Sequence, residues 1–327
     1  MNKFCTGRKQ WDSQHLSKNM KPKFHHSNKE HLFKLAFSNG ISGRGTLGYS
    51  RWSSRPLPTL LTGGETEVLQ RPGFFDYEES SSPQVADWYM NFANNEIFSA
   101  WATSLLAQDE LQVAEHPALI GMRIEAMKEG ISLWSVEDGV PTPILITGVE
   151  RRLSIDTSPN EGAGRPHGIY GNYFRNASES QITSATTVIT PPTKSNILAI
   201  EAPAYGSGRY TSNTITFILN TAYSGFSAVS DESRLSLNAS TVRIHSGFWG
   251  CGAYGGNRVL MLILQMVAAR LAGIDQIIFH TGDGSGSLPF RESYEIFRRI
   301  PRENLSVNQV IDLVAGYHFE WGESDGN

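Results

Sequence analysis

Short apolar runs and one long apolar segment alternate along the second half of the chain. Pro143–Thr147 and Ile197–Ile200 are apolar runs of the length typical of buried strands. Asn257–Leu271 predicts a helix, with Asn257 as its N-cap and Gly273 just beyond its end. Because the helix is nearly all apolar, it has to be covered on most sides.

The same alternation continues towards the C-terminus. Ile277–Phe279 predicts a third buried strand, and Ser306 caps a predicted helix that runs through Val314 with apolar residues at helical spacing. Asp109–Val113 marks the start of another helix, whereas Val85–Ile97 mixes strand and helix signals. The alternation predicts an α/β fold, with a sheet covered by helices on both faces.

The first 79 residues have a different pattern. Residues 1–45 hold nine Lys or Arg against two acidic residues, and the stretches Asn39–Pro58 and Thr62–Ser82 are rich in Gly, Ser and Pro. We expect residues 1–79 to be a basic, partly irregular extension, solvated or facing an acidic partner, and residues 80–327 to be the folded domain. The histidines at 25, 26 and 31 lack further ligands nearby, so the sequence does not predict a metal site there.

Composition limits the class of protein. With 39% hydrophobic and 18% charged residues the chain can bury a core, and its net charge of −4 argues against a dedicated nucleic-acid binder. No apolar run reaches the roughly 18–20 residues that cross a bilayer. The N-terminus lacks the apolar stretch of a signal peptide, so we expect a cytoplasmic protein, or a secreted effector that uses no such signal. The two cysteines, Cys5 and Cys251, exclude a disulfide scaffold.

Two segments carry candidate chemistry. Gly247–Asn257 contains five glycines and leads into the apolar helix, so its backbone N–H groups can converge on an anion such as a diphosphate at a helix N-terminus. The same pattern also suits a plain tight turn. Asp109 and Glu110 lie in the first turn of a predicted helix, where acids favour the helix dipole. Adjacent helical residues point about 100° apart, so they cannot work as two facing carboxylates.

In this order, the segments resemble the poly(ADP-ribose) glycohydrolase family, a branch of the macrodomain fold. The resemblance covers about residues 84–318. It rests on Asn91-Phe92-Ala93-Asn94, Phe98-Ser99-Ala100, Gln108-Asp109-Glu110-Leu111, Pro117 and the run Gly247–Asn257. Four further stretches fit in the same order, at residues 146–150, 197–202, 222–226 and 279–283.

The resemblance implies a macrodomain-like mixed β-sheet sandwiched between helices, and an ADP-ribosyl glycohydrolase that needs no metal or cofactor. It implies that Glu110 protonates the oxygen leaving the anomeric carbon, and that Asp109 holds ribose hydroxyls. A protonated acid near neutral pH needs burial or a neighbouring like charge, which Asp109 can supply. The implied substrate-binding residues are Asn91, Asn94, Gln108, Tyr223, Gly250, Cys251, Gly252, Ala253, Tyr254, Gly255 and Gly256. Trp249 and Cys251 are also expected to pack in the core.

Several positions depart from the family pattern. Phe98-Ser99-Ala100 replaces three glycines, so we expect the first loop to have another shape, with a ring near the diphosphate. Asn91 and Asn257 stand where the family has acids, and Phe248 where it has an asparagine. These changes leave three hypotheses open: a hydrolase of mono-ADP-ribose on protein rather than of long polymers, a module that binds ADP-ribose without cleaving it, or an enzyme of changed chemistry on an NAD-derived metabolite.

Overall fold

The computed structural model describes residues 2–40, 43, 45–61, 64–78, 82–301 and 305–326. Its centre is a mixed sheet of eight strands in the order β1-β2-β7-β8-β4-β9-β10-β3. These strands are Cys5–Asp12 (β1), Thr46–Trp52 (β2), Glu67–Arg71 (β3), Val85–Ala93 (β4), Ile144–Ile155 (β7), Thr186–Glu201 (β8), Thr241–Ser246 (β9) and Gln276–His280 (β10). A separate hairpin pairs Val136–Glu137 (β5) with Val140–Pro141 (β6).

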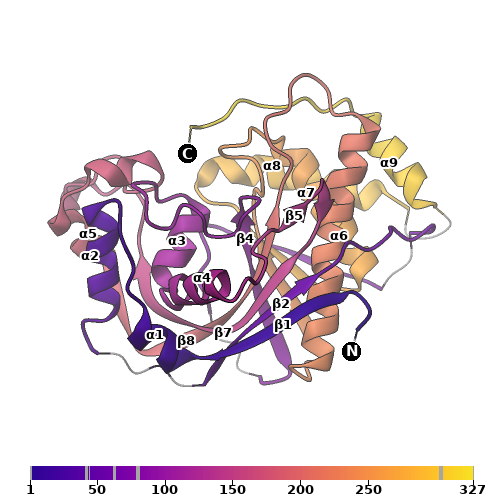
Figure 1. The fold of residues 1–327 in the computed structure, drawn as a ribbon. Coiled ribbons are helices and arrows are strands. Elements are labelled where there is room, and N and C mark those ends of the chain that lie inside the picture. Colours follow the sequence, from indigo (N-terminus) through magenta and orange to yellow (C-terminus); the bar gives the residue numbers. More distant parts are fainter. Residues whose placement is uncertain are drawn as a thin grey trace.

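Helices cover both faces of the sheet, as the alternation of elements predicts (Figure 1). The α-helices are Ser13–Asn19 (α1), Ser27–Ala36 (α2), Gln108–Glu115 (α3), Ala118–Lys128 (α4), Glu179–Ala185 (α5), Ser212–Leu235 (α6), Arg258–Ala272 (α7), Ser287–Arg299 (α8) and Val307–Ala315 (α9). Short 3-10 turns span Glu161–Ala163 (η1), Asn172–Asn176 (η2) and Gly284–Gly286 (η3). Helices α6 to α9 pack on one face, and α1, α3 and α4 pack on the other.

Strand direction divides the sheet into two halves. Strands β8, β4, β9, β10 and β3 run parallel to one another. Strands β7, β2 and β1 extend the sheet from β8 in antiparallel pairs. The carboxyl ends of the five parallel strands therefore meet at one edge. In open α/β sheets ligands bind outside this edge, so the topology itself indicates where a site should lie.

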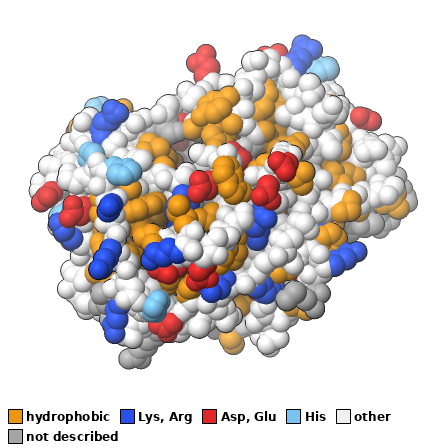
Figure 2. Space-filling view, viewed as in Figure 1, with side chains coloured by type: hydrophobic (Ala, Val, Ile, Leu, Met, Phe, Trp, Pro, Cys, Tyr) orange, Lys and Arg blue, Asp and Glu red, His pale blue; other side chains and the backbone are white. Residues whose placement is uncertain are grey.

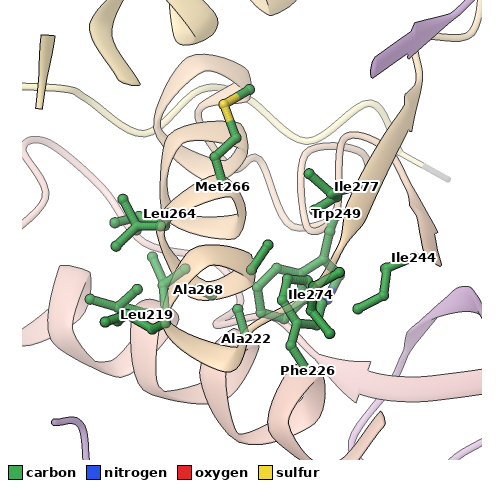
Figure 3. Close-up of a cluster of buried hydrophobic side chains, with 14 of the residues drawn as sticks. Leu219, Ala222, Phe226, Ile244, Trp249, Leu264, Met266, Ala268, Ile274 and Ile277 are labelled. Atoms are coloured by element: carbon green, nitrogen blue, oxygen red, sulfur yellow. The ribbon is translucent and has the colours of Figure 1, made fainter. Parts of the chain in front are cut away.

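The apolar helix α7 forms the centre of the larger core. Asn257 caps it by accepting hydrogen bonds from the N–H groups of Val259 and Leu260, and Gly273 ends it in the left-handed conformation. Both predicted ends are confirmed. Figure 3 shows Trp249 among side chains of α6, α7, β9 and β10, in line with its predicted packing role.

Two ambiguous segments are now assigned by their packing. Val85–Ile97 contains β4, whose alternate side chains enter opposite cores: Trp88 and Met90 face one, and Ala93 faces the other. Thr214–Ala222 lies inside the long helix α6. The capping box of Ser306 with Gln309 confirms the predicted start of α9.

The prediction of an irregular N-terminal extension is wrong. Strands β1, β2 and β3 belong to the central sheet, and β1 and β2 pair over their whole length. The pattern escaped detection because β1 exposes Thr6, Arg8 and Gln10, whereas its buried side chains, Cys5 and Trp11, are few. The expected boundary between residues 79 and 80 lies outside the described residues.

Exposed basic side chains nevertheless gather on one side of the molecule. Figure 2 shows Lys, Arg and His side chains over the region of α1, α2 and α5. We call this group the basic face; its exposed members are His15, Lys18, Lys21, Lys23, His25 and Lys34. No helix in the described part of the chain is both long and apolar enough to span a membrane.

Candidate active site

A cavity of about 570 Å³ lies at the carboxyl edge of the parallel strands. Each of the five strands supplies lining residues just past its end, so the cavity is assembled from segments far apart in sequence. Representative lining residues are Phe74 after β3, Asn94 after β4, Ala202 after β8, Phe248 after β9 and Thr281 after β10.

The cavity opens where β4 and β9 separate. Their ladder ends at the pair Tyr89 and His245, which leaves the next backbone groups of β4 without a strand partner on that side. Gln108, the first residue of α3, supplies the missing partners: its Oε1 accepts from Phe92 N–H at 2.7 Å, and its Nε2 donates to the Met90 carbonyl at 3.0 Å. Gln108 therefore fixes the start of α3 against the sheet, and both ends of its amide are used in doing so.

The acidic pair begins α3 at the wall of the cavity. Asp109 and Glu110 both line the cavity, and both side chains are buried. The Asn91 amide donates to Asp109 Oδ1 at 3.0 Å, and Glu110 Oε2 accepts from the Ala107 N–H at 3.0 Å. The pair is thus held by one side-chain contact from β4 and one backbone contact at the N-terminus of α3.

Burial, and after it the neighbouring Glu110 carboxylate, raises the pKa of Asp109 to about 7. Asn91, Lys29 and Arg123 oppose this shift without cancelling it. Asp109 can therefore hold a proton close to neutral pH, as an acid in a catalytic site requires.

A buried lysine lies behind the acids. Lys29 of α2 is almost fully buried, donates from Nζ to the Trp101 carbonyl at 3.2 Å, and is close enough to both acids for their charges to raise its pKa. Desolvation outweighs these charges and lowers the pKa of Lys29 to about 8. The expectation of a solvated N-terminal segment missed this residue, because a lysine in a basic stretch is normally exposed.

The second wall is the glycine-rich loop, and it presents backbone rather than side chains. No described residue accepts a hydrogen bond from the N–H groups of Gly252, Ala253 or Tyr254, and all three residues line the cavity. Gly250 and Gly255 have φ angles of +74° and +68°, which lets the loop turn back on itself. Three successive amides without a partner form the type of nest that binds an anion.

Positive charge reinforces this loop. The N-terminus of α7 follows it directly, and Arg258, the first residue of α7, also lines the cavity. The Arg258 guanidinium lies 4.8 Å from the centre of the Phe248 ring and donates to Ser285 Oγ at 3.1 Å. The loop therefore combines unpaired amides, a helix N-terminus and a cation at one wall.

The C-terminal tail crosses the outer side of this loop (Figure 1). The Gly322 N–H donates to the Gly255 carbonyl at 2.8 Å, and Asn257 Nδ2 donates to the Glu320 carbonyl at 3.0 Å. Asp325 lines the cavity, and its carboxylate would lie 3.2 Å from a Cβ placed on Gly252. An acidic side chain thus stands beside the amide nest.

Aromatic rings line the remaining space. Tyr254 lies 5.4 Å from Tyr205, whose side chain is 72% exposed, and Phe74 stacks on Tyr170 at 5.4 Å on the other side. Burial raises the pKa of Tyr254 and of Tyr170, so both phenols stay neutral at physiological pH. Exposed flat rings beside an anion site are suited to stacking on a planar ligand.

The structure brings most predicted site residues to this one cavity. Those that line it are Asn94, Gln108, Asp109, Glu110, Gly250, Cys251, Gly252, Ala253 and Tyr254. Cys251 is not only a core residue, because it also reaches the cavity, although burial raises the pKa of its thiol and keeps it protonated.

Four predicted binding residues do not line the cavity. Asn91 is fully buried beneath Asp109, and Tyr223 packs against the large core from α6. Gly255 and Gly256 shape the loop from behind: a Cβ on either would lie within 3.0 Å of a backbone oxygen, from Gly322 or from Gly250. Their contribution is to the shape of the wall.

The ring of Phe98 does not lie where the sequence predicts. Its ring does not reach the cavity but is fully buried in the core beneath α3 and α4, while its backbone has a φ of +57°. The first loop therefore keeps a left-handed residue at the first of the three positions where the family has glycines. The expected obstruction by a ring is wrong, because the ring turns away from the cavity.

Sequence reasoning missed several lining residues. Arg258 follows the predicted N-cap directly, and Tyr205 follows a predicted strand, so position alone could have indicated both. Phe74, Tyr170 and Asp325 come from segments that looked like irregular connections or a tail, and only the folded chain brings them together.

Residues 143–286 match the family model described as poly(ADP-ribose) glycohydrolase (PARG), macro domain fold. This stretch contains the glycine-rich loop but not Asp109 and Glu110.

Solved structures similar to the chain include two bacterial PARG proteins. The one from Thermomonospora curvata has 14% identity and a TM-score of 0.44, over 83% of this chain and 88% of the other. The one from Deinococcus radiodurans in complex with ADP-ribose has 12% identity and a TM-score of 0.40, over 90% and 94%. The chain is thus similar to the poly(ADP-ribose) glycohydrolase family and has a macrodomain-like α/β fold.

Proposed function

We propose that the protein is a hydrolase that cleaves the ribosidic bond of an ADP-ribosyl group. The observation that carries the proposal is a single cavity with an amide nest on one wall and two buried acids, Asp109 and Glu110, on the other. A diphosphate would accept hydrogen bonds from the amides of Gly252, Ala253 and Tyr254. The ribose joined to it would then extend towards Asp109 and Glu110.

The proposed chemistry is general acid catalysis. A ribosidic bond breaks through an oxocarbenium-like state, and the departing oxygen needs a proton. Glu110 delivers that proton, and Asp109 beside it binds ribose hydroxyls. Asn91 acts by orienting Asp109 from beneath, and Gln108 acts by fixing the start of α3. Water then attacks the anomeric carbon, and the proton that it releases restores the pair.

We propose mono-ADP-ribose on protein as the substrate class, rather than long polymers. Two features support this. The tail with Asp325 crosses the outer side of the glycine-rich loop and narrows the approach there. The basic face, of which Lys21 and Lys34 are members, offers a surface for an acidic modified protein.

The test is release of ADP-ribose from a mono-ADP-ribosylated protein. Glu110→Gln is the informative variant, because a glutamine oxygen can still accept from the Ala107 N–H. We expect it to lower kcat by about 10²–10⁴-fold while the affinity for ADP-ribose is retained. Glu161→Gln, at an exposed acid in a distant loop, is the matched control.

Two outcomes would contradict the proposal. Equal release by the wild-type protein and Glu110→Gln would exclude the acid role. Tight binding of ADP-ribose by calorimetry, with no release from any linkage, would identify a binding module in place of a hydrolase.

A further inference from the structure

A second group of chemically active side chains lies beside the cavity and takes no part in the proposed reaction. The side chains of His245 in β9 and His280 in β10 lie in contact, and Asp76 comes close to both from the segment that follows β3. One ligand atom from each residue lies within 4.8 Å of the other two. Among the described residues this is the one group of three His, Cys, Asp or Glu side chains so arranged.

The hydrogen bonds around the two imidazoles determine where their protons lie. His280 Nδ1 is 2.9 Å from the Phe74 carbonyl oxygen, which can only accept, so Nδ1 carries the proton. His245 Nε2 is 3.0 Å from Asp87 Oδ1. Arg243 pairs with the same carboxylate at 2.7 Å, so Asp87 accepts from His245 as well.

The remaining two nitrogens face each other. His245 Nδ1 and His280 Nε2 are 3.1 Å apart, and with the opposite nitrogens protonated each presents a lone pair. Two lone pairs at this distance repel unless a cation lies between them.

The surroundings are those of a transition-metal site. Metal-binding histidines generally donate their other ring N–H to a carboxylate or a backbone carbonyl, which is the role of Asp87 and Phe74 here. Two Zn–N bonds of about 2.0–2.1 Å in a tetrahedral site place the nitrogens about 3.4 Å apart, close to the distance observed. Tyr89 stacks on His245 at 4.3 Å, and Phe75 meets His280 edge-on at 5.0 Å, which gives the site an apolar shell.

Two arginines face the group, and their charges are matched by acids. Arg71 pairs with Asp76 Oδ2 at 2.6 Å, and Arg243 pairs with Asp87 at 2.7 Å. Asp76 keeps its second oxygen, Oδ1, which accepts only a long hydrogen bond of 3.4 Å from the Glu78 N–H among the described residues. A two-histidine, one-carboxylate set is therefore available to a divalent ion.

We propose that His245 Nδ1, His280 Nε2 and an Asp76 carboxylate oxygen bind one divalent transition-metal ion, for which Zn²⁺ is the probe. The ion would tie the segment after β3 to the carboxyl ends of β9 and β10. Since Phe74 and Phe75 in that segment line the cavity, the ion would fix the position of one cavity wall. This site is separate from Asp109 and Glu110, and it goes beyond the proposed hydrolase activity.

The test is a calorimetric titration of the full chain with Zn²⁺ after removal of metal by EDTA and dialysis. We expect one Zn²⁺ per chain, a tetrahedral Co²⁺ absorption band on substitution, and a higher unfolding temperature with Zn²⁺. His280→Gln should abolish the site, and Asp76→Asn should weaken binding about tenfold or more. Asp283→Asn, at an acid on the same cavity, should leave affinity unchanged.

A double variant distinguishes this site from the N-terminal histidines. The double variant His25→Gln with His26→Gln should bind Zn²⁺ as the wild type does. Loss of binding in this double variant, or no Zn²⁺ binding by the wild type, would overturn the proposal and leave a proton-bridged histidine pair. If His280→Gln does not fold, Asp76→Asn decides, because the Asp76 side chain is 34% exposed and tolerates replacement.

Discussion

The two walls of the cavity are built in opposite ways. The wall at Asn91–Glu110 works through side chains: Gln108 crosslinks helix to strand, Asn91 supports Asp109, and the acids face the cavity. The wall at Gly247–Asn257 works through backbone amides and shows few side-chain contacts at its nest. Substitutions should therefore act on the first wall by removing groups, and on the second by adding them.

The largest expected effect tests how the first wall holds its shape. Phe98→Ala removes a fully buried ring and should lower the free energy of unfolding by about 3–5 kcal/mol. Phe98→Gly removes the same ring but also removes the strain of the left-handed conformation at residue 98. That conformation costs a non-glycine residue roughly 1–2 kcal/mol. Phe98→Gly should thus be the more stable of the two, which urea unfolding measures. The opposite order would show that φ at residue 98 is not left-handed.

The second wall should respond to an added methyl group. Gly250→Ala keeps a φ of +74° and places a Cβ 2.5 Å from the Ala202 Cβ, so strain and overlap together should cost about 2–4 kcal/mol. The affinity for ADP-ribose should fall with it, as measured by calorimetry. Gly130→Ala is the matched control, with a φ of +67° and nothing within 4 Å of its Cβ. Equal losses in the two variants would mean that the loop has room for a side chain.

The two walls also differed in how far the sequence revealed them. The glycine-rich loop was predicted with its helix, N-cap and C-cap, because glycines and caps are local signals. The hydrogen bonds between Asn91 and Asp109 and between Gln108 and β4 were not predicted, because they depend on where β4 and β9 separate. The same limit hid Lys29, and also the group of Asp76, His245 and His280, whose members are spread over the chain.

The N-terminal strands show the physical reason. An edge strand such as β1 needs few apolar side chains, and β1 places one on each face of the sheet, with Cys5 in the larger core and Trp11 in the other. Its remaining side chains are polar, so the segment looked like a basic arm. Hydrophobic periodicity predicts helices and strands that bury many side chains. Strands that bury few side chains form because of long-range pairing, which the sequence pattern does not reveal.

A smaller, pH-dependent effect separates the acids of the first wall. The pKa of Asp109 is raised to about 7 in the folded protein from an unfolded value near 3.8. A raised carboxyl pKa stabilises the fold below pH 3.8, and this contribution is lost as the pH rises to 7. The Asp109→Asn variant has no carboxyl group to ionise and does not lose this stabilisation. Its free energy of unfolding relative to wild type should therefore increase with pH, by up to about 1.4 kcal/mol per pH unit between pH 3.8 and 7.

Thermal unfolding of both proteins between pH 4.5 and 8 measures this difference. Glu161→Gln, at an exposed acid, should show no comparable trend. A pH-independent gap between wild type and Asp109→Asn would mean that Asp109 is ionised throughout this pH range.

The smallest expected effect concerns the charge that faces the amide nest. Asp325→Asn removes a carboxylate beside Gly252, where a diphosphate would bind, and keeps a side chain of similar size. An exposed charge is worth about 0.2–1 kcal/mol, so the affinity for ADP-ribose should rise by about two- to fivefold. The gain should shrink at high salt, because exposed charges are screened. Glu323→Gln, on the same tail, should change affinity less. If both variants behaved as wild type, the nest would bind its anion out of reach of the tail, and the two walls alone would define the site.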